Sequence, residues 1–127
     1  MLILVYECPM NERSPPAARK TLLVSSDTKM LEIYGDLLKS KAHEIIRSQT
    51  AKESLKVLIR RPTGWEAIVV DQKLLDLSGL SLIKTIRRMC YGARTIILLG
   101  GGPSLEADHV VPANTLGLAK FMEIIGR

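Results

Sequence analysis

The sequence predicts an α/β fold in which one parallel sheet of five strands carries helices on both faces. Short apolar runs alternate along the chain with longer segments of helical periodicity, which is typical of βα units. The apolar runs contain few polar positions, as expected for strands that are covered on both faces. With right-handed crossovers, this order of elements gives a flavodoxin-like, doubly wound sheet.

The strands are placed where short apolar runs end at a glycine or a polar residue. The run "RTIILL" is very apolar, whereas "HEIIRS" is weaker and "HVV" is short. The expected strands are, in order, 21–24, 43–48, 66–71, 94–99 and 109–111.

The helices are placed by the spacing of their apolar residues. In the first, either Ile33 or Tyr34 is expected to face the sheet, and in the second Ile59 is expected to point inward. Pro62 and Gly64 end the second helix. The expected helices are 28–40, 50–60, 78–89 and 115–125.

Length and composition predict one domain preceded by a short arm. The 127 residues are 46% apolar and 24% charged, and no apolar run approaches the roughly 18 residues that span a bilayer. Residues 1–19, with a proline-rich and charged stretch, are expected to form an N-terminal arm or linker, and residues 20–127 the domain. The opening "MLILVY" lacks a basic region before it and a cleavage site of small residues after it, so we expect a cytoplasmic protein.

The net charge of +5 and the pI near 9.4 suit an acidic partner or nucleic acid. The basic residues, however, are scattered along the sequence, several of them at predicted helix ends, where cations favour the helix dipole. One tryptophan, three tyrosines and one phenylalanine offer little stacking surface for bases. We therefore expect a solvated basic surface, and nucleic-acid binding is disfavoured.

Three strand ends carry the residues from which a site could be built, because parallel α/β sheets bind ligands at the carboxyl ends of their strands. They are Ser25-Ser26-Asp27, Asp71 and Gly100-Gly101-Gly102. The serines would need a histidine base to act as nucleophiles, and neither His43 nor His109 is expected near them. The glycine run lacks a Walker lysine and the GxGxxG spacing, so a tight connection is favoured over a phosphate-binding loop.

From Lys20 to Arg127 the chain resembles the receiver domains of bacterial two-component response regulators. The stretch "IVVDQKLLDLSGLSLIKTIRR" resembles the family's third strand, phosphoacceptor, loop glycine and helix, which places the phosphoacceptor on Asp71 and the glycine on Gly79. The stretch "KTLLVSSDTKMLEIYGDLLKSKAHEII" resembles the first strand and helix, and "ADHVV" the approach to the fifth strand. The resemblance implies a CheY-like receiver topology and a role in signal transduction.

The resemblance also implies a magnesium site, and the chain departs from the family there. In such receivers an acidic pair after the first strand holds Mg²⁺ together with the phosphoacceptor, and that pair falls on Ser25 and Ser26. Neutral hydroxyls remove most of the attraction for a hard cation that dehydrates reluctantly. Because that cation neutralises the transferred phosphoryl oxygens, we expect no cofactor, with Mg²⁺ required only if Asp71 still accepts a phosphoryl group.

Further positions of the resemblance are changed as well. The family's hydroxyl residue after the fourth strand falls on Gly100, its lysine after the fifth strand falls on Ala113, and its switching aromatic falls on Val110. The connection 100–109 is close to the shortest that parallel strands allow. We therefore expect the fourth helix to be missing or very short.

Two aspartates each leave two interpretations open. Asp27 is either a substitute acid near Asp71 or, as the residues favour, the N-cap of the helix that begins at Thr28. Asp71 is either a vestigial or weak phosphoacceptor or a polar strand terminus that bonds nearby backbone or Lys73.

The sequence as a whole favours an atypical receiver that signals through protein contacts, with an impaired Mg²⁺-dependent site and no enzymatic activity. The expected partners are other signalling proteins, namely a histidine kinase or a downstream effector; a homodimer is allowed, and no membrane is expected. Two alternatives remain. One is a working phosphorelay receiver phosphorylated on Asp71, with Asp27 supplying part of a metal site. The other is a small flavodoxin-like domain that binds a nucleotide or nucleic acid through its basic surface.

Overall fold

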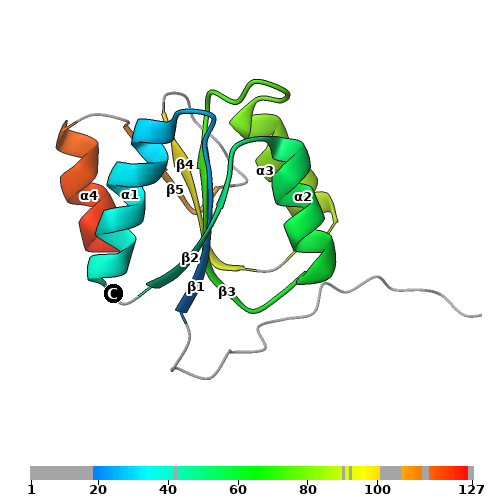
Figure 1. Cartoon of the computed structure of the whole chain (residues 1–127), viewed down its shortest axis with the longest axis horizontal. Helices are drawn as coiled ribbons and strands as arrows, with labels where there is room; N and C mark the ends of the chain where they lie inside the picture. The colour runs from blue at the N-terminus through cyan, green and yellow to red at the C-terminus, as the bar shows by residue number, and fades with distance from the viewer. Residues whose placement is uncertain are drawn as a thin grey trace, which may run out of the picture.

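The computed structural model describes residues 19–41, 43–89, 91, 93–100, 107–112 and 115–125, which form a three-layer α/β fold (Figure 1). The strands are β1 (Arg19–Val24), β2 (His43–Ser48), β3 (Trp65–Asp71), β4 (Ala93–Leu99) and β5 (His109–Val111). The helices are α1 (Thr28–Ser40), α2 (Ala51–Arg60), α3 (Gly79–Arg88) and α4 (Thr115–Ile125). None of these described helices is long and apolar enough to cross a membrane.

The sheet has the order β2-β1-β3-β4-β5, and all of its strand pairs are parallel. The chain winds from β1 to β2 in one direction and from β3 to β5 in the other, so the winding reverses between β1 and β3. Val24 pairs with Val70 across these two strands, which brings the residues after them, Ser25 and Asp71, to the switch point. The predicted flavodoxin-like sheet is confirmed, and its switch point is where such folds bind ligands.

The helices cover the two faces of the sheet in pairs. Helices α1 and α4 pack on one face, and α2 and α3 pack on the other (Figure 1). Side chains alternate along β1, so Leu22 and Val24 face α2 and α3 while Leu23 faces α1 and α4. The rings of Tyr34 and Phe121 meet edge to face with centroids 4.8 Å apart, which joins α1 to α4.

The element boundaries differ from the predicted ones where capping residues decide them. Thr50 and Ser78, predicted as first helical residues, are N-caps whose side-chain oxygens accept from the amides of Glu53 and Ser81. A hydroxyl residue at this position satisfies an amide that the helix leaves free, so it precedes the helix instead of joining it. Strand β1 begins at Arg19, one residue before the predicted start of the domain.

The inward faces of two helices are also settled. Tyr34 is buried, and Ile33 is 47% exposed. The prediction that Ile59 faces the sheet is wrong, because its side chain is 67% exposed while the neighbouring Leu58 is fully buried. Successive residues of a helix point about 100° apart, and on α2 the buried face is centred on Leu58, so Ile59 turns out toward solvent.

Three predictions lie outside the described residues. They concern the arm at 1–18, the missing fourth helix, which depends on 101–106, and Ala113. The described ends of that connection, Gly100 and Ala107, lie in bends.

Gly79 begins α3 at a point where the backbone of β3 leaves no room for a side chain. A Cβ atom there would lie 2.8 Å from the Cα atom of Gln72 and 2.9 Å from the carbonyl carbon of Asp71. The Gly79 amide donates to the Gln72 carbonyl oxygen at 2.9 Å, which fixes this close approach.

Gly79→Ala is expected to lower the free energy of unfolding by about 1–3 kcal/mol, because the crowded atoms are backbone and cannot move aside. Gly35→Ala is the matched control: a Cβ atom there first meets the flexible guanidinium of Arg47, and alanine is preferred to glycine inside a helix by roughly 1 kcal/mol. Urea unfolding of both variants checks this. Equal destabilisation by the two substitutions would contradict it.

Candidate functional site

The carboxyl ends of three adjacent strands meet at one edge of the sheet. Ser25 follows β1, Asp71 ends β3 and Gly100 follows β4, and Asp71 pairs in register with Leu99. The structure thus brings together the three strand ends that the sequence singled out, although Gly101 and Gly102 lie outside the described residues.

A hydrogen bond between Ser25 and Asp71 lies at the centre of this edge. The Ser25 hydroxyl donates to Oδ2 of Asp71 at 2.8 Å, and both residues are buried, Asp71 being 8% exposed. The other carboxylate oxygen, Oδ1, accepts from the backbone amide of Lys73 at 3.1 Å. This backbone hydrogen bond is part of the strand-terminus interpretation of Asp71, and its use as a phosphoacceptor stays a prediction. Hydrogen bonds to a charged group contribute about 1.5–3 kcal/mol each, so this arrangement is well held.

Ser26 ties together three loops around the site. Its hydroxyl donates to the carbonyl oxygen of Gln49, before α2, and accepts from the amide of Leu75, between β3 and α3. These contacts measure 2.8 and 3.1 Å. The oxygen of Ser26 is therefore engaged by the backbone of its neighbours.

Asp27 is the N-cap of α1, as the sequence favoured. Its Oδ1 accepts from the amide of Lys29 at 2.9 Å, and its own amide donates to the Ser25 hydroxyl at 3.1 Å. A carboxylate in this position satisfies a free amide and complements the helix dipole. Its alternative use as a substitute acid stays a prediction.

Gly100 occupies a backbone conformation that favours glycine, with φ of 124°. Its amide donates to the carbonyl oxygen of Val111, which holds the end of β4 against β5. A Cβ atom at Gly100 would lie 2.7 Å from the Cβ atom of Gln72. The hydroxyl residue that the resemblance places here would therefore be both strained and crowded by Gln72. In the described part of the chain, Gln72 Oε1 is a buried oxygen without a hydrogen-bond partner.

The described residues do not fit a magnesium ion. Mg²⁺ requires hard, preferably anionic oxygen ligands in nearly octahedral geometry. At this edge Asp71 supplies a single carboxylate, and both of its oxygens already accept hydrogen bonds, while Asp27 caps its helix. No group of three or more His, Cys, Asp or Glu residues that could hold a metal occurs among the residues that the structure describes.

Asp76 is a residue of this edge that sequence reasoning missed. From the loop between β3 and α3, its two carboxylate oxygens accept from the amides of Ala51 and Lys52 at 2.9 and 3.0 Å. The carboxylate thus caps α2 from a distant part of the chain, and these backbone hydrogen bonds hold the pKa of Asp76 below its ordinary value. Thr50, the local cap, gave no sign that a second cap was needed.

The two histidines lie away from the serines, as expected. His43 starts β2, where its Nδ1 lies 2.6 Å from the hydroxyl oxygen of Thr21 and its Nε2 lies 3.4 Å from the carbonyl oxygen of Ile125. His109 starts β5, and both histidines line a pocket of about 130 Å³ beside the last turn of α4. Since β2 pairs with β1 from Arg19 onward, His43 lies at the opposite end of β1 from Ser25.

No model of a known protein family matches the chain, but solved structures resemble it closely. The response regulator TrrA of Thermotoga maritima, solved in complex with Mg²⁺ and BeF, superposes with a TM-score of 0.70 at 22% identity, covering 84% of this chain and 98% of that one. The receiver domain of Saccharomyces cerevisiae Ssk1, solved with the histidine phosphotransfer protein Ypd1, gives 0.70 at 17% identity, covering 86% and 87%. The chain has the receiver fold.

Curated relatives carry the same kind of name. The transcriptional regulatory protein GlrR of Escherichia coli is 27% identical over 101 residues, which is 80% of this chain and 22% of that protein. The two-component response regulator ARR11 of Arabidopsis thaliana is 27% identical over 71 residues, 56% of this chain and 14% of that protein. The chain thus spans less than a quarter of the length of these relatives.

Asp76→Asn is expected to destabilise the protein at neutral pH, because a neutral amide keeps one acceptor oxygen for two backbone amides. Since the folded pKa of Asp76 is lowered, the carboxylate contributes its full stabilisation above the ordinary pKa of 3.8, and loses it as the pH falls through the lowered pKa. The difference in unfolding free energy between native and variant proteins should therefore shrink on acidification below 3.8. Asp36→Asn makes the same charge change on the exposed side of α1, and a similar pH-dependent loss there would contradict the assignment.

Tyr34 provides a reporter for the charge of Asp71. Burial, and secondarily the charge of Asp71, raise the pKa of Tyr34 above its ordinary value of 10.0. Asp71→Asn removes the second cause, so the pKa of Tyr34 should fall and yet stay above 10.0. Tyrosinate absorption during alkaline titration, with Tyr34→Phe to assign the signal, measures it. An unchanged pKa would show that the Asp71 charge does not act on Tyr34.

Proposed function

We propose that this chain is an atypical receiver domain of two-component signalling that works through protein contacts and does not run a Mg²⁺-dependent phosphorylation cycle. The observation that carries the proposal is the 2.8 Å hydrogen bond from Ser25 to Asp71, in which a neutral hydroxyl lies against the acceptor carboxylate. The receiver fold and the names of the similar proteins support the signalling role.

The chemistry of phosphoryl transfer supports the loss of the cycle. A carboxylate that attacks a phosphoryl group is repelled by the negative charge of that group. Catalysis therefore depends on a cation that neutralises the phosphoryl oxygens during transfer. Asp71 has Ser25 and the Lys73 amide as hydrogen-bond donors, and no second carboxylate of the described residues bonds beside it to attract a divalent cation. Asp71 then serves as the hydrogen-bonded end of β3.

The residues that would respond to a phosphoryl group support the same conclusion. Gly100 has no hydroxyl to reorient toward Asp71, and Ala113 stands where the family has its lysine. Val110 packs at the margin of the core on the α2 and α3 side, where the resemblance places an aromatic switch. A signal therefore passes through this domain by binding and release of partners, without enzymatic activity of its own.

The partners proposed are signalling proteins, a histidine kinase or a downstream effector, in the cytoplasm. Among the similar proteins, the Ssk1 receiver is seen with a histidine phosphotransfer protein, and GlrR is named a transcriptional regulatory protein, which supports signalling partners for this fold. Formation of a homodimer is compatible with this role.

The first experiment is intact mass after incubation with acetyl phosphate, with and without Mg²⁺, on the native chain and on Asp71→Asn. We expect no added phosphoryl mass on either protein under conditions that label an ordinary receiver. A Mg²⁺-dependent gain on the native chain that is lost in Asp71→Asn would overturn the proposal and establish the phosphorelay alternative.

The metal requirement is tested by restoring the acidic pair. Ser25→Asp combined with Ser26→Asp places two carboxylates beside Asp71, whose mutual repulsion a divalent cation relieves. Calorimetric titration should show Mg²⁺ binding to this double variant and none to the native chain, and Ser25→Asn with Ser26→Asn is the uncharged control. Equal Mg²⁺ affinity of native and double-variant proteins would contradict the role assigned to the serines.

A further inference from the structure

The two helix layers of the fold differ sharply in charge. In the layer of α1 and α4, acidic and basic residues are equal in number, caps included: α1 has Asp27, Glu32 and Asp36 against Lys29, Lys39 and Lys41, and α4 has Glu123 against Lys120. In the other layer, three basic residues of α2, Arg61 at its C-cap and three of α3 make seven, against Glu53 on α2 and Asp76, whose carboxylate caps the start of α2. We call these seven the basic face: Lys52, Lys56, Arg60, Arg61, Lys84, Arg87 and Arg88.

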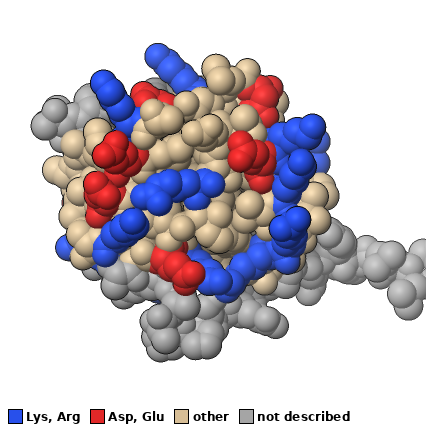
Figure 2. Space-filling model, viewed as in Figure 1, with Lys and Arg blue, Asp and Glu red and all other residues tan. Residues whose placement is uncertain are grey.

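The fold gathers residues that the sequence spreads over nearly forty positions. Helices α2 and α3 lie side by side on one face of the sheet and run in the same direction (Figure 1). Lys52, Lys56 and Arg60 are four residues apart, so they form one row on α2 with steps of about 6 Å. Figure 2 shows a band of Lys and Arg along the side of the molecule occupied by α2, whereas acidic and basic side chains are interspersed over α1.

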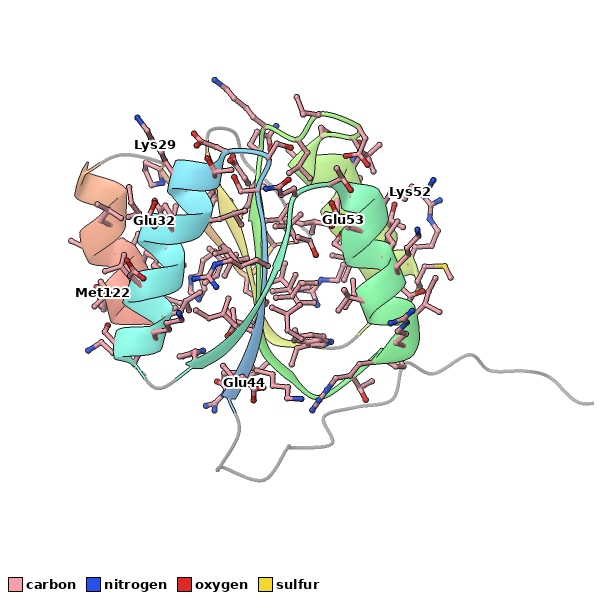
Figure 3. All side chains as sticks on the ribbon, in the orientation of Figure 1. Lys29, Glu32, Glu44, Lys52, Glu53 and Met122 are labelled. Carbon is pink, nitrogen blue, oxygen red and sulfur yellow. The ribbon has the colours of Figure 1, made fainter. Side chains whose placement is uncertain are left out.

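Little in the described chain neutralises this face. Arg87 forms an ion pair with Asp108 at 3.3 Å. Within the described residues, the other members of the basic face have no acidic side chain within ion-pair distance. Figure 3 shows Lys52 projecting away from α2. On α1, by contrast, the same figure shows an acidic residue, Glu32, on the helix that carries Lys29. Cations held together without counter-charges repel one another, and an acidic partner relieves that repulsion.

Two exposed apolar side chains beside the basic face favour a protein as the partner. Ile59, near the end of α2, is 67% exposed, and Met89, at the C-cap of α3, is 49% exposed. They adjoin Arg60 and Arg88 in the sequence, at the same end of the two parallel helices. Apolar residues with arginines around them are typical of the centre of protein interfaces.

Nucleic acid fits this surface less well. A phosphate backbone gains nothing from Ile59 or Met89, and stacking on bases requires exposed aromatic rings. Among the described aromatic side chains of this layer, Trp65 is buried, with its indole N–H donating to the carbonyl oxygen of Arg61, and Tyr91 is half-buried against the core. A partner must therefore offer carboxylates and apolar side chains together, which is the pattern of an acidic amphipathic helix.

We propose that the basic face docks an acidic amphipathic helix of a partner protein. Carboxylates of that helix lie along Lys52, Lys56 and Arg60, and its apolar residues cover Ile59 and Met89. The inference rests on the proposed function in one respect, that the domain acts through protein contacts. Because docking is measured on the unphosphorylated chain and the proposed function by phosphoryl mass, either can fail without the other.

The test uses a fluorescent synthetic peptide that forms a helix with leucines on one side and glutamates on the other, titrated with the full chain at low salt. Fluorescence anisotropy should show binding that Lys56→Glu combined with Arg60→Glu weakens at least about tenfold. Ile59→Ser should weaken it as well. Lys29→Glu combined with Lys39→Glu makes the same charge change on α1 and should leave binding nearly unchanged. Equal losses in the two double variants would overturn the proposal.

Three competitor probes separate this partner from other polyanions. They are the same peptide with glutamine in place of leucine, a short duplex DNA, and vesicles of phosphatidylserine and phosphatidylcholine. Each should bind more weakly than the amphipathic peptide, and tighter or equal binding of any of them would overturn the proposal. Amide chemical-shift changes on addition of the peptide should map to α2 and α3, and changes confined to α1 and α4 would place the contact elsewhere.

Discussion

A carboxylate buried at the end of a parallel strand needs hydrogen-bond donors, and in this chain the hydroxyl of Ser25 provides one for Asp71. The rest of the edge is arranged around that pair. Since Ser25 also accepts from the amide of Asp27, the first turn of α1 is positioned by the same oxygen that holds β3. Ser26 and Asp27 do not bond to Asp71. Ser26 hydrogen-bonds the backbone of two neighbouring loops, and Asp27 caps α1.

The carboxyl edge of the sheet is a hydrogen-bond network that joins loops. Ser26 joins the loops that follow β1, β2 and β3, and Asp76 ties the last of these to the start of α2. Gly100 and Gln72 are matched in the same way, because the space beside Gln72 is available only when residue 100 has no side chain. Gly100 and Gln72 therefore depend on one another, and any side chain at position 100 meets steric resistance from Gln72.

Much of this organisation follows from sequence pattern. The spacing of apolar residues predicted the nine elements that the structure describes, and the convergence of strand ends in a parallel sheet brought Ser25, Asp71 and Gly100 to one edge. The bond from Leu75 to Ser26 and the cap from Asp76 to α2 were not predictable, since nothing local fixes where a loop side chain points. The basic face was missed for a different reason: its charges were read along the chain, whereas they converge only when two crossovers place α2 and α3 on one face. Ile59, assigned to the core by its apolar character, belongs to that surface.

Across the described sheet, a neutral helix layer faces a cationic one, so the charge of these two layers is unevenly distributed as in a dipole. In the field of an acidic molecule such a dipole experiences a torque, so the domain rotates to present α2 and α3 before any side chain touches. The first collisions are then oriented ones, within the Debye length of about 8 Å that physiological salt allows. A partner docked on α2 and α3 would leave the layer of α1 and α4 open to a second molecule.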